Sequence, residues 1–282
     1  MNLKTPLHKA CSGIFRYMVK TLGCPDWSFD EILEAAKSLG YQGIEIRGID
    51  GQMRADKIVP FLPGNQQDTI RKVNDYKLDI CTFGSSVKFD NPLKLDEMLE
   101  EGRISIGICA RMGIPFVRVF GEKIENEGNE QLVIDSIADG IETLCLYAQG
   151  TEVNVLLEVH GDFNRADRIL KIANKITSPK FGVLWDIEHS DKVYGDNFKA
   201  FYEPIKNLVR HVHVKDHIRN SGEFMLCSIG AGDIPTKEIF ELLERNGYKG
   251  YYSLEWEKKW HSELADPEVE FPSYVAFMNS LF

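Results

Sequence analysis

Residues 130–160, EQLVIDSIADGIETLCLYAQGTEVNVLLEVH, contain a helix pattern followed by a strand pattern. Apolar residues in the first part recur at the spacing of one helical face: Val133, Ile137, Ile141 and Leu144. The last part, 153–160, is rich in β-branched and aliphatic residues, which is typical of a strand. An amphipathic helix next to an apolar strand is the building unit of an α/β fold.

The same alternation runs through the rest of the chain. Strand-like runs occur at 41–47, 79–84, 114–120, 153–160, 181–186, 209–215 and 250–257, with a weaker eighth candidate at 8–17. Helix patterns with start and stop residues lie at 29–39 and 236–246. Eight strand–helix units of about 35 residues each predict a (β/α)₈ TIM barrel, formed as a single domain by residues 1–282. The structural alternative is a doubly wound open sheet, which more often carries a G-x-G-x-x-G fingerprint, and the sequence has none.

The charge, the cysteine spacing and the apolar runs of the sequence argue against several classes of function. Asp and Glu outnumber Lys and Arg by 43 to 33, and the net charge of −10 argues against a sequence-independent nucleic-acid binder and against an anionic membrane surface as partner. The six cysteines are scattered without a C-x-x-C pair, so neither a disulfide framework nor a thiolate zinc site is indicated. The sequence begins without a secretory pattern and has no apolar run of about 18 residues, so we expect a cytoplasmic protein.

Four residues with metal-ligand chemistry stand near the ends of four consecutive predicted strands. They are Glu158, Asp186, His213 and Glu255. A barrel turns the C-terminal ends of its strands toward one mouth, so we expect the four side chains to converge there. Each of them alone is interpreted most simply as a rim salt bridge or a chance histidine, but four at successive strand ends favour one shared site.

Three carboxylates and an imidazole around one point repel each other unless a cation is present. An oxygen-rich set with one nitrogen suits a divalent metal ion with open positions, and Mn²⁺ is favoured over Mg²⁺, Co²⁺ or Zn²⁺. Such an ion would polarise a substrate carbonyl and an adjacent hydroxyl, which acidifies the neighbouring C–H bond. Carboxylates at the edge of the metal site could then shuttle the proton.

Four other polar residues are candidates for substrate binding. His160 shares the strand face of Glu158, His189 lies three residues beyond Asp186, Lys215 shares the face of His213, and Arg219 follows His213 by six residues on the expected loop. A solvent-exposed loop histidine is the alternative for His189, and a supporting role behind the metal ligands is the alternative for His160.

Several conspicuous residues receive structural interpretations instead. Glu45 and Arg47 at the end of the run 41–47 are interpreted as a satisfied ion pair. Trp185 and Trp256 have the opposite strand parity to the ligand candidates, which indicates packing between barrel and helices. The glycines of SIGAGDIP at 228–235 could hold an anion on backbone N–H groups, but a turn without ligand is favoured.

The motifs LLEVHG, VLWDIEHS, HVHVKD, GAGDIP and YYSLEWEKKWH resemble those of the sugar phosphate isomerase/epimerase family of xylose-isomerase-like TIM barrels. The resemblance covers nearly the whole chain and is strongest from 155 to 261. It implies a divalent metal on Glu158, Asp186, His213 and Glu255. Ketose 3-epimerases of this group imply further that Glu158 and Glu255 act as an opposed acid/base pair, and that His189 and Arg219 bind substrate.

Two positions depart from the family pattern. Ala231 stands where the family commonly has an acidic residue, and His160 stands where the epimerases tend to have Asn.

From the four ligand candidates and the family resemblance, we predict an isomerase or epimerase that moves a proton next to the carbonyl of a sugar through a metal-bound enediolate. The alternatives are a lyase that dehydrates an inosose-like ring or cleaves a 3-keto-glycoside, and a sugar-binding barrel without catalysis. The implied partner is a small-molecule sugar, and similar barrels are often homo-oligomers.

Overall fold

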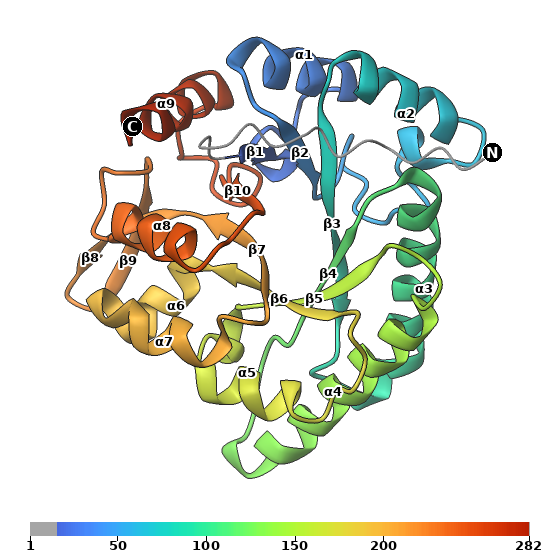
Figure 1. Ribbon diagram of the computed structural model, residues 1–282, viewed down its shortest axis with the longest axis vertical. Coiled ribbons are helices and arrows are strands. Elements are labelled where there is room, and N and C mark those ends of the chain that lie inside the picture. The colour runs from blue at the N-terminus through green and yellow to red at the C-terminus, as the bar shows by residue number, and fades with distance from the viewer. Residues whose placement is uncertain (1–15, 282) are drawn as a thin grey trace.

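The computed structural model describes residues 16–281, and its centre is a closed barrel of parallel strands (Figure 1). The barrel strands are β1 (Arg16–Lys20), β2 (Gly43–Ile46), β3 (Asp79–Lys88), β4 (Phe116–Phe120), β5 (Asn154–Glu158), β6 (Phe181–Asp186), β7 (Val209–Val214) and β10 (Tyr251–Leu254). Their order around the barrel is β1-β10-β7-β6-β5-β4-β3-β2, and each pairs in parallel with its neighbours. The (β/α)₈ prediction is confirmed.

The first strand runs further along the chain than the sequence suggested. Residues 8–15 of the candidate run 8–17 lie outside the described residues, and β1 extends from Arg16 to Lys20. Its register pairs Val19 with Leu254 of β10 and with Ile44 of β2. The strand ends in a buried lysine, which an apolar pattern does not count as part of a strand, so the prediction ended the strand too early.

Helices surround the barrel (Figure 1). The α-helices are α1 (Phe29–Leu39), α2 (Gln66–Asp75), α3 (Leu95–Met112), α4 (Glu130–Tyr147), α5 (Ala166–Ala173), α6 (Ile187–Tyr194), α7 (Phe198–Ile205), α8 (Thr236–Arg245) and α9 (Pro267–Ser280). Short 3₁₀ turns are η1 (Thr21–Gly23), η2 (Val59–Phe61), η3 (Pro92–Lys94), η4 (Glu127–Asn129), η5 (Gly161–Phe163) and η6 (Gly195–Asn197). None of the described helices combines the length and apolar character needed to cross a membrane.

Local sequence explains where the helices begin and end. At α1, Ser28 accepts a hydrogen bond from the backbone N–H of Glu31, and the Glu31 carboxylate accepts one from the backbone N–H of Ser28 at 2.7 Å. This capping box satisfies amide groups that the first helical turn leaves unpaired. Gly40 ends the helix with φ of +83°, a conformation that glycine adopts without steric cost. The predicted bounds 29–39 are confirmed.

The two tryptophans pack between barrel and helices, as predicted. Trp185 is fully buried, its ring stacks on Tyr202 with centroids 5.2 Å apart, and its Nε1 donates to Ser190 Oγ at 2.8 Å. Trp256 is buried and donates to the carbonyl oxygen of Ala265 at 2.8 Å. Neither side chain is therefore available as a platform for a sugar ring.

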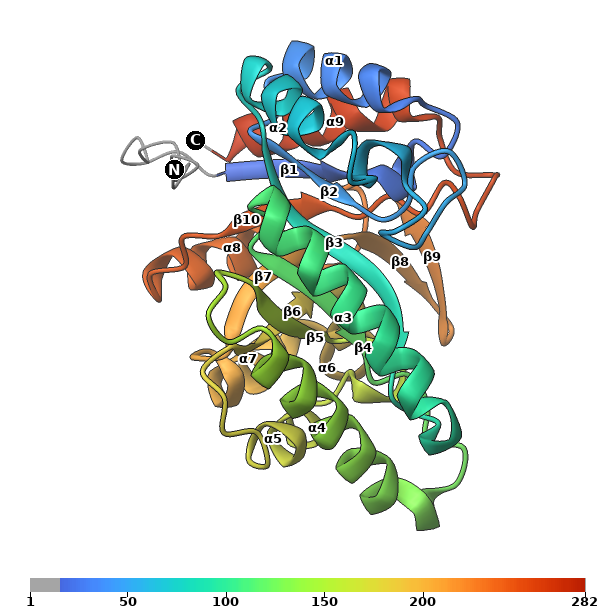
Figure 2. The same ribbon diagram turned by 90° about the vertical axis from the view of Figure 1, so that its right-hand side faces the viewer.

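A β-hairpin that the sequence did not predict is inserted between β7 and α8. Its strands are β8 (Asp216–Asn220) and β9 (Glu223–Cys227), which pair in antiparallel fashion. Figure 2 shows the hairpin on the side of the molecule toward which β1 runs. The hairpin thus borders the mouth formed by the C-terminal ends of the barrel strands.

Candidate metal centre and active site

The four predicted ligand residues meet inside the mouth of the barrel. Glu158 ends β5, Asp186 ends β6, His213 is the penultimate residue of β7, and Glu255 directly follows β10. All four are buried, and one ligand-type atom of each lies within 4.8 Å of the others. Nδ1 of His213 is 3.2 Å from Glu158 Oε1, 3.9 Å from Asp186 Oδ2 and 2.9 Å from Glu255 Oε2. The imidazole therefore stands at the centre of the three carboxylates.

The carboxylates are neutralised in part by basic side chains of the protein itself. Lys20 at the end of β1 forms a buried ion pair with Glu255, and Arg118 in β4 places Nε 2.8 Å from Glu158 Oε2. Sequence reasoning missed both residues. Their signal was a charged residue inside an otherwise apolar strand, RYMVK and FVRVF, because a buried charge needs a partner.

Lys215, a predicted substrate-binding residue, is also buried among the acids. Its Nζ lies 2.9 Å from Asp186 Oδ2, 3.2 Å from Glu255 Oε2 and 3.0 Å from Glu257 Oε1. With Lys20 and Arg118 it makes three protein cations at this site. These three cations relieve part of the repulsion between the carboxylates without a metal ion.

Below this cluster lies a second group of polar side chains that also faces the barrel interior. Glu45 in β2 accepts from Ser253 Oγ at 2.9 Å, and its Oε2 is 2.8 Å from His211 Nε2. Its Oε1 is 2.9 Å from Nε2 of His213. The expected pair of Glu45 with Arg47 is not formed, because Glu45 points down the barrel toward the two histidines while Arg47 lies beyond the strand end at the rim.

Burial and neighbouring charges shift the pKa values of Asp186 and Glu158 in different directions. Burial raises the pKa of Asp186 to about 8, against the opposing effect of Lys215, and the Glu255 carboxylate adds to the rise. Burial also acts to raise the pKa of Glu158, but the Arg118 guanidinium and His213 together outweigh it, and this pKa lies below its ordinary value. The pKa shift of Asp186 is thus opposite in direction to that of Glu158.

The pKa values of His213 and His189 are shifted in opposite directions. Burial opposes the charged form of His213, but Glu255 and Glu45 raise its pKa well above the ordinary histidine value. Burial lowers the pKa of His189 well below that value, and the positive charge of Lys215 adds to the decrease. At neutral pH His189 is therefore an uncharged hydrogen-bonding group.

The donor set fits a divalent metal ion. One oxygen of each carboxylate is buried and accepts no hydrogen bond of good geometry: Glu158 Oε2, Asp186 Oδ2 and Glu255 Oε2. Together with Nδ1 of His213 they offer three oxygens and one nitrogen, which suits ions such as Mn²⁺, Mg²⁺, Co²⁺ or Zn²⁺. The cluster could therefore hold a metal once the proton of His213 and the ion pairs on these oxygens are displaced.

His160 and His189 lie side by side. Their ring centroids are 4.1 Å apart, and His160 also contacts the Phe120 ring at 4.8 Å and the Glu122 carboxylate at 3.6 Å. His189 lies in the first turn of α6, the helix that directly follows the strand with Asp186, and 14% of its side chain is exposed. The pair adds uncharged hydrogen-bonding groups beside the acid cluster.

Arg219 is held by acids of its own. It lies in β8 and not in a loop, its Nη2 is 2.6 Å from Asp191 Oδ1, and its Nη1 is 2.9 Å from Asp196 Oδ1. Any contact of this guanidinium with a substrate would have to compete with these two carboxylates.

The glycine-rich turn binds a carboxylate of the protein itself. The backbone N–H groups of Gly230 and Gly232 donate to Asp216 Oδ2 at 2.8 and 3.0 Å. An internal carboxylate therefore occupies the donors that could otherwise have held an external anion.

The model of the xylose isomerase-like TIM barrel family matches residues 33–280. This chain belongs to the xylose isomerase-like TIM barrel family. Among curated proteins none matches its sequence. Solved structures with the same fold include the IOLI protein with a bound zinc atom, at 17% identity and a TM-score of 0.78, covering 95% of this chain and 99% of the other.

Two further structures resemble this xylose isomerase-like barrel over nearly its whole length. The probable 3-DHS dehydratase AsbF from Bacillus anthracis has 14% identity and a TM-score of 0.74, covering 94% of this chain and 99% of the other. The 3-keto-D-glucoside 4-epimerase YcjR from E. coli has 16% identity and the same TM-score, with the same coverage. At these sequence identities the likeness establishes only the fold of the xylose isomerase-like barrel. The reaction has to be inferred from the residues of the site.

Proposed function

We propose that this protein is a metal-dependent isomerase or epimerase that moves a proton at the carbon next to the carbonyl of a sugar or sugar derivative. The observation that carries the proposal is the convergence of Glu158, Asp186, His213 and Glu255 within 4.8 Å of one another at the barrel mouth. The four would hold the ion, and Mn²⁺ suits their oxygen-rich set best. A divalent ion there would supply Lewis-acid polarisation of a substrate carbonyl.

The protein's own carboxylates would move the proton. Glu158 comes from β5 and Glu255 from β10, the two ends of the arc β5-β6-β7-β10, so they reach the site from different sides. One would take a proton from carbon as the base, and the other, protonated from solvent, would give a proton to the opposite face of that carbon or to the neighbouring carbon. Removal and return by two different groups is what an epimerase needs.

Other residues would orient the substrate. His160 and His189 would hydrogen-bond substrate hydroxyls as uncharged groups, and Lys215, within 3.2 Å of both Asp186 and Glu255, would donate to a substrate oxygen between them. Arg219 would contribute from the hairpin, where its guanidinium now binds Asp191 and Asp196.

Proton exchange with solvent tests the proposal directly. We expect the metal-loaded protein in D₂O to incorporate deuterium into at least one member of a panel of ketoses and keto-sugar derivatives, observed by NMR. The variants Glu158→Gln and Glu255→Gln should each lower the exchange rate by roughly 10²–10⁴-fold. Glu241→Gln, a charge-matched change in an exposed α8 residue paired with Arg245, should leave it unchanged. Absence of deuterium in every compound would contradict the proposal.

A lyase is the second candidate, because a cationic donor lies beside the acids. Once a proton has left carbon, a neighbouring hydroxyl leaves more readily if a group beside it donates a proton, and the Lys215 ammonium lies 2.9 Å from Asp186 and 3.2 Å from Glu255. The two reactions separate by their products. A dehydratase forms an unsaturated product with new ultraviolet absorbance, whereas an epimerase forms an isomer without it.

A further inference from the structure

Lys215 is a buried ammonium that contacts three carboxylates, and these contacts differ in kind. Its side chain is 4% exposed, and its Nζ donates a hydrogen bond to Glu257 Oε1 at 3.0 Å. Nζ also lies 2.9 Å from Asp186 Oδ2 and 3.2 Å from Glu255 Oε2, but neither of these oxygens accepts a hydrogen bond of good geometry. Among the described residues, Glu257 is therefore the acceptor toward which the ammonium is directed.

The two contacts without hydrogen-bond geometry place Lys215 on the candidate metal site itself. Asp186 and Glu255 belong to the group of four residues that could hold an ion, and the oxygens near Nζ are the ones that they leave unpaired. An ammonium within 3.2 Å of both oxygens competes with another cation for them. Because two cations on one pair of oxygens repel each other, the ammonium needs a different anionic partner when an ion is bound.

Glu257 is placed to be that partner. It lies outside the group of four and two residues beyond Glu255, on the segment that follows β10, and its side chain is 21% exposed. Its second oxygen, Oε2, is 3.6 Å from Nε2 of His261, which is 44% exposed. The carboxylate thus reaches from the buried ammonium toward the surface, and it can hold Lys215 without taking an oxygen away from the metal site.

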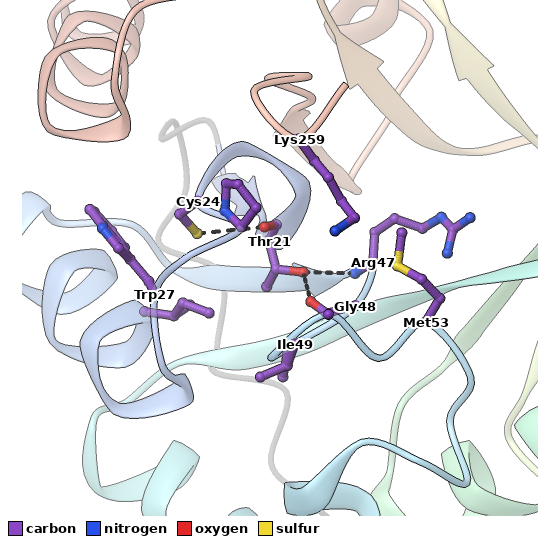
Figure 3. A pocket seen from close by; sticks show the side chains of 11 residues that line it. Thr21, Cys24, Trp27, Arg47, Gly48, Ile49, Met53 and Lys259 are labelled. Carbon is purple, nitrogen blue, oxygen red and sulfur yellow. Dashed lines mark hydrogen bonds between the residues drawn. The ribbon is translucent and has the colours of Figure 1, made fainter. Parts of the chain in front are cut away.

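Backbone contacts fix the segment that carries Glu257. The carbonyl oxygen of Glu257 accepts from the backbone N–H of Trp260 at 2.9 Å, and the backbone N–H of Lys259 donates to the carbonyl oxygen of Leu22 at 3.3 Å. Figure 3 shows Lys259 at the same small pocket as Thr21, the residue that directly follows β1. These contacts hold Glu257 in place through the backbone, independently of the metal ligands.

We propose that Glu257 is a positioning residue, which holds the Lys215 ammonium beside the acid cluster when Asp186 and Glu255 bind the metal ion. The inference rests on the proposed function and adds a residue to it. Without the Glu257 carboxylate, the ammonium has only the carboxylates of the metal ligands to pair with, and it competes with the ion. With this carboxylate, the ammonium leaves the ligands to the ion and donates to a substrate oxygen at the barrel mouth.

The affinity for Mn²⁺, measured by competition with a chelator, tests the inference in the wild type, Glu257→Gln, Lys215→Met and the double variant. We expect Glu257→Gln to lower the affinity by about 10–100-fold, because Lys215 then competes with the ion. Lys215→Met should raise the affinity, because the competing cation is gone. In the Lys215→Met background, Glu257→Gln should change the affinity by less than about threefold.

Glu263→Gln is the matched control, because it removes one carboxylate from the same loop. Glu263 is 72% exposed and lies 3.2 Å from His261, and none of the described ion pairs joins it to Lys215. This variant should keep the Mn²⁺ affinity within about twofold of the wild type. An equal loss from Glu257→Gln with and without Lys215 would show that the carboxylate acts through its charge alone, which would overturn the inference.

Folding and function are checked on the same samples. Thermal melting of the metal-free variants shows whether each is folded, and where Lys215→Met fails to fold because buried carboxylates lose a counter-ion, Lys215→Gln takes its place in the comparison. Deuterium exchange into a ketose without coupling between positions 257 and 215 in Mn²⁺ affinity would overturn this inference and leave the proposed function standing. Coupling between these positions without exchange into any compound of the panel would do the reverse.

Discussion

Nε2 of His213 lies 2.9 Å from Oε1 of Glu45, at the floor of the acid cluster. The other ring nitrogen, Nδ1, faces Glu158 and Glu255. A carboxylate on one ring nitrogen keeps the proton there and leaves the lone pair of the other nitrogen for a metal. Glu45 is thereby assigned the task of orienting His213, and it is itself held by His211 and Ser253.

Replacing Glu45 should weaken metal binding. We expect Glu45→Ala to lower the affinity for Mn²⁺ by about 10–100-fold, because the imidazole loses its fixed orientation, whereas Glu45→Gln should lose less since its amide oxygen still accepts a hydrogen bond. Competition with a chelator measures the affinity. The control is Glu270→Gln, a buried carboxylate that binds Ser228 outside the barrel mouth. An unchanged affinity in Glu45→Ala would refute the assigned task.

Metal affinity should increase with pH. Burial raises the pKa of Asp186 to about 8, and the pKa of His213 is also raised, by Glu255 and Glu45 against the effect of burial. Both groups must release protons before they can bind a metal, so affinity should climb from pH 6.5 to 8.5 by up to about tenfold per pH unit for each proton released. Electron paramagnetic resonance of free Mn²⁺ at three pH values measures this. A flat profile would show that neither group holds a proton.

His217 should make stability depend on pH. Its two ring nitrogens lie 3.0 Å from Glu188 and 2.8 Å from Asp191, and against the effect of burial these carboxylates raise its pKa to about 9. The imidazolium stabilises the fold fully below the unfolded histidine pKa near 6.5, and this contribution disappears as pH rises through about 9.

Urea unfolding from pH 6 to 9.5 should therefore separate His217→Asn from the wild type. We expect the variant to be less stable by about 2 kcal/mol at pH 6 and to approach the wild type at pH 9.5. His261→Gln is the control, since His261 is 44% exposed and pairs with Glu257 and Glu263 at the surface. A constant difference across the range would mean that only the packing of His217 matters.

Removing Asp216 should destabilise the protein. Its carboxylate accepts backbone N–H groups of His217, Gly230, Gly232 and Ile234, and thus joins the hairpin to the turn before α8. Asp216→Ala leaves these donors unpaired, for which we expect a loss of about 2–4 kcal/mol in urea unfolding. Asp196→Ala, which changes an 83% exposed carboxylate, should lose less than 1 kcal/mol. Equal losses would contradict the bracing role of Asp216.

Much of this molecule was readable from patterns along the chain. The period of apolar residues determined α1 and α4, and the runs of β-branched residues located seven of the eight barrel strands, because burial on both faces of a parallel strand leaves a continuous apolar signal. Glu158, Asp186, His213 and Glu255 were predictable as neighbours because strand ends meet at one rim of a barrel.

Tertiary structure alone decided which charges meet. Lys20, Glu45, Arg118 and His211 come from strands spread over 192 positions of sequence, and no local pattern tells which acid faces which base across a barrel. The pairing depends on the register of the strands and the direction of each side chain into one enclosed space. For that reason the sequence alone determined the barrel and its four ligand-type residues. Which cations neutralise these residues, and that Arg47 forms no ion pair among the described residues, is decided only by the closed barrel.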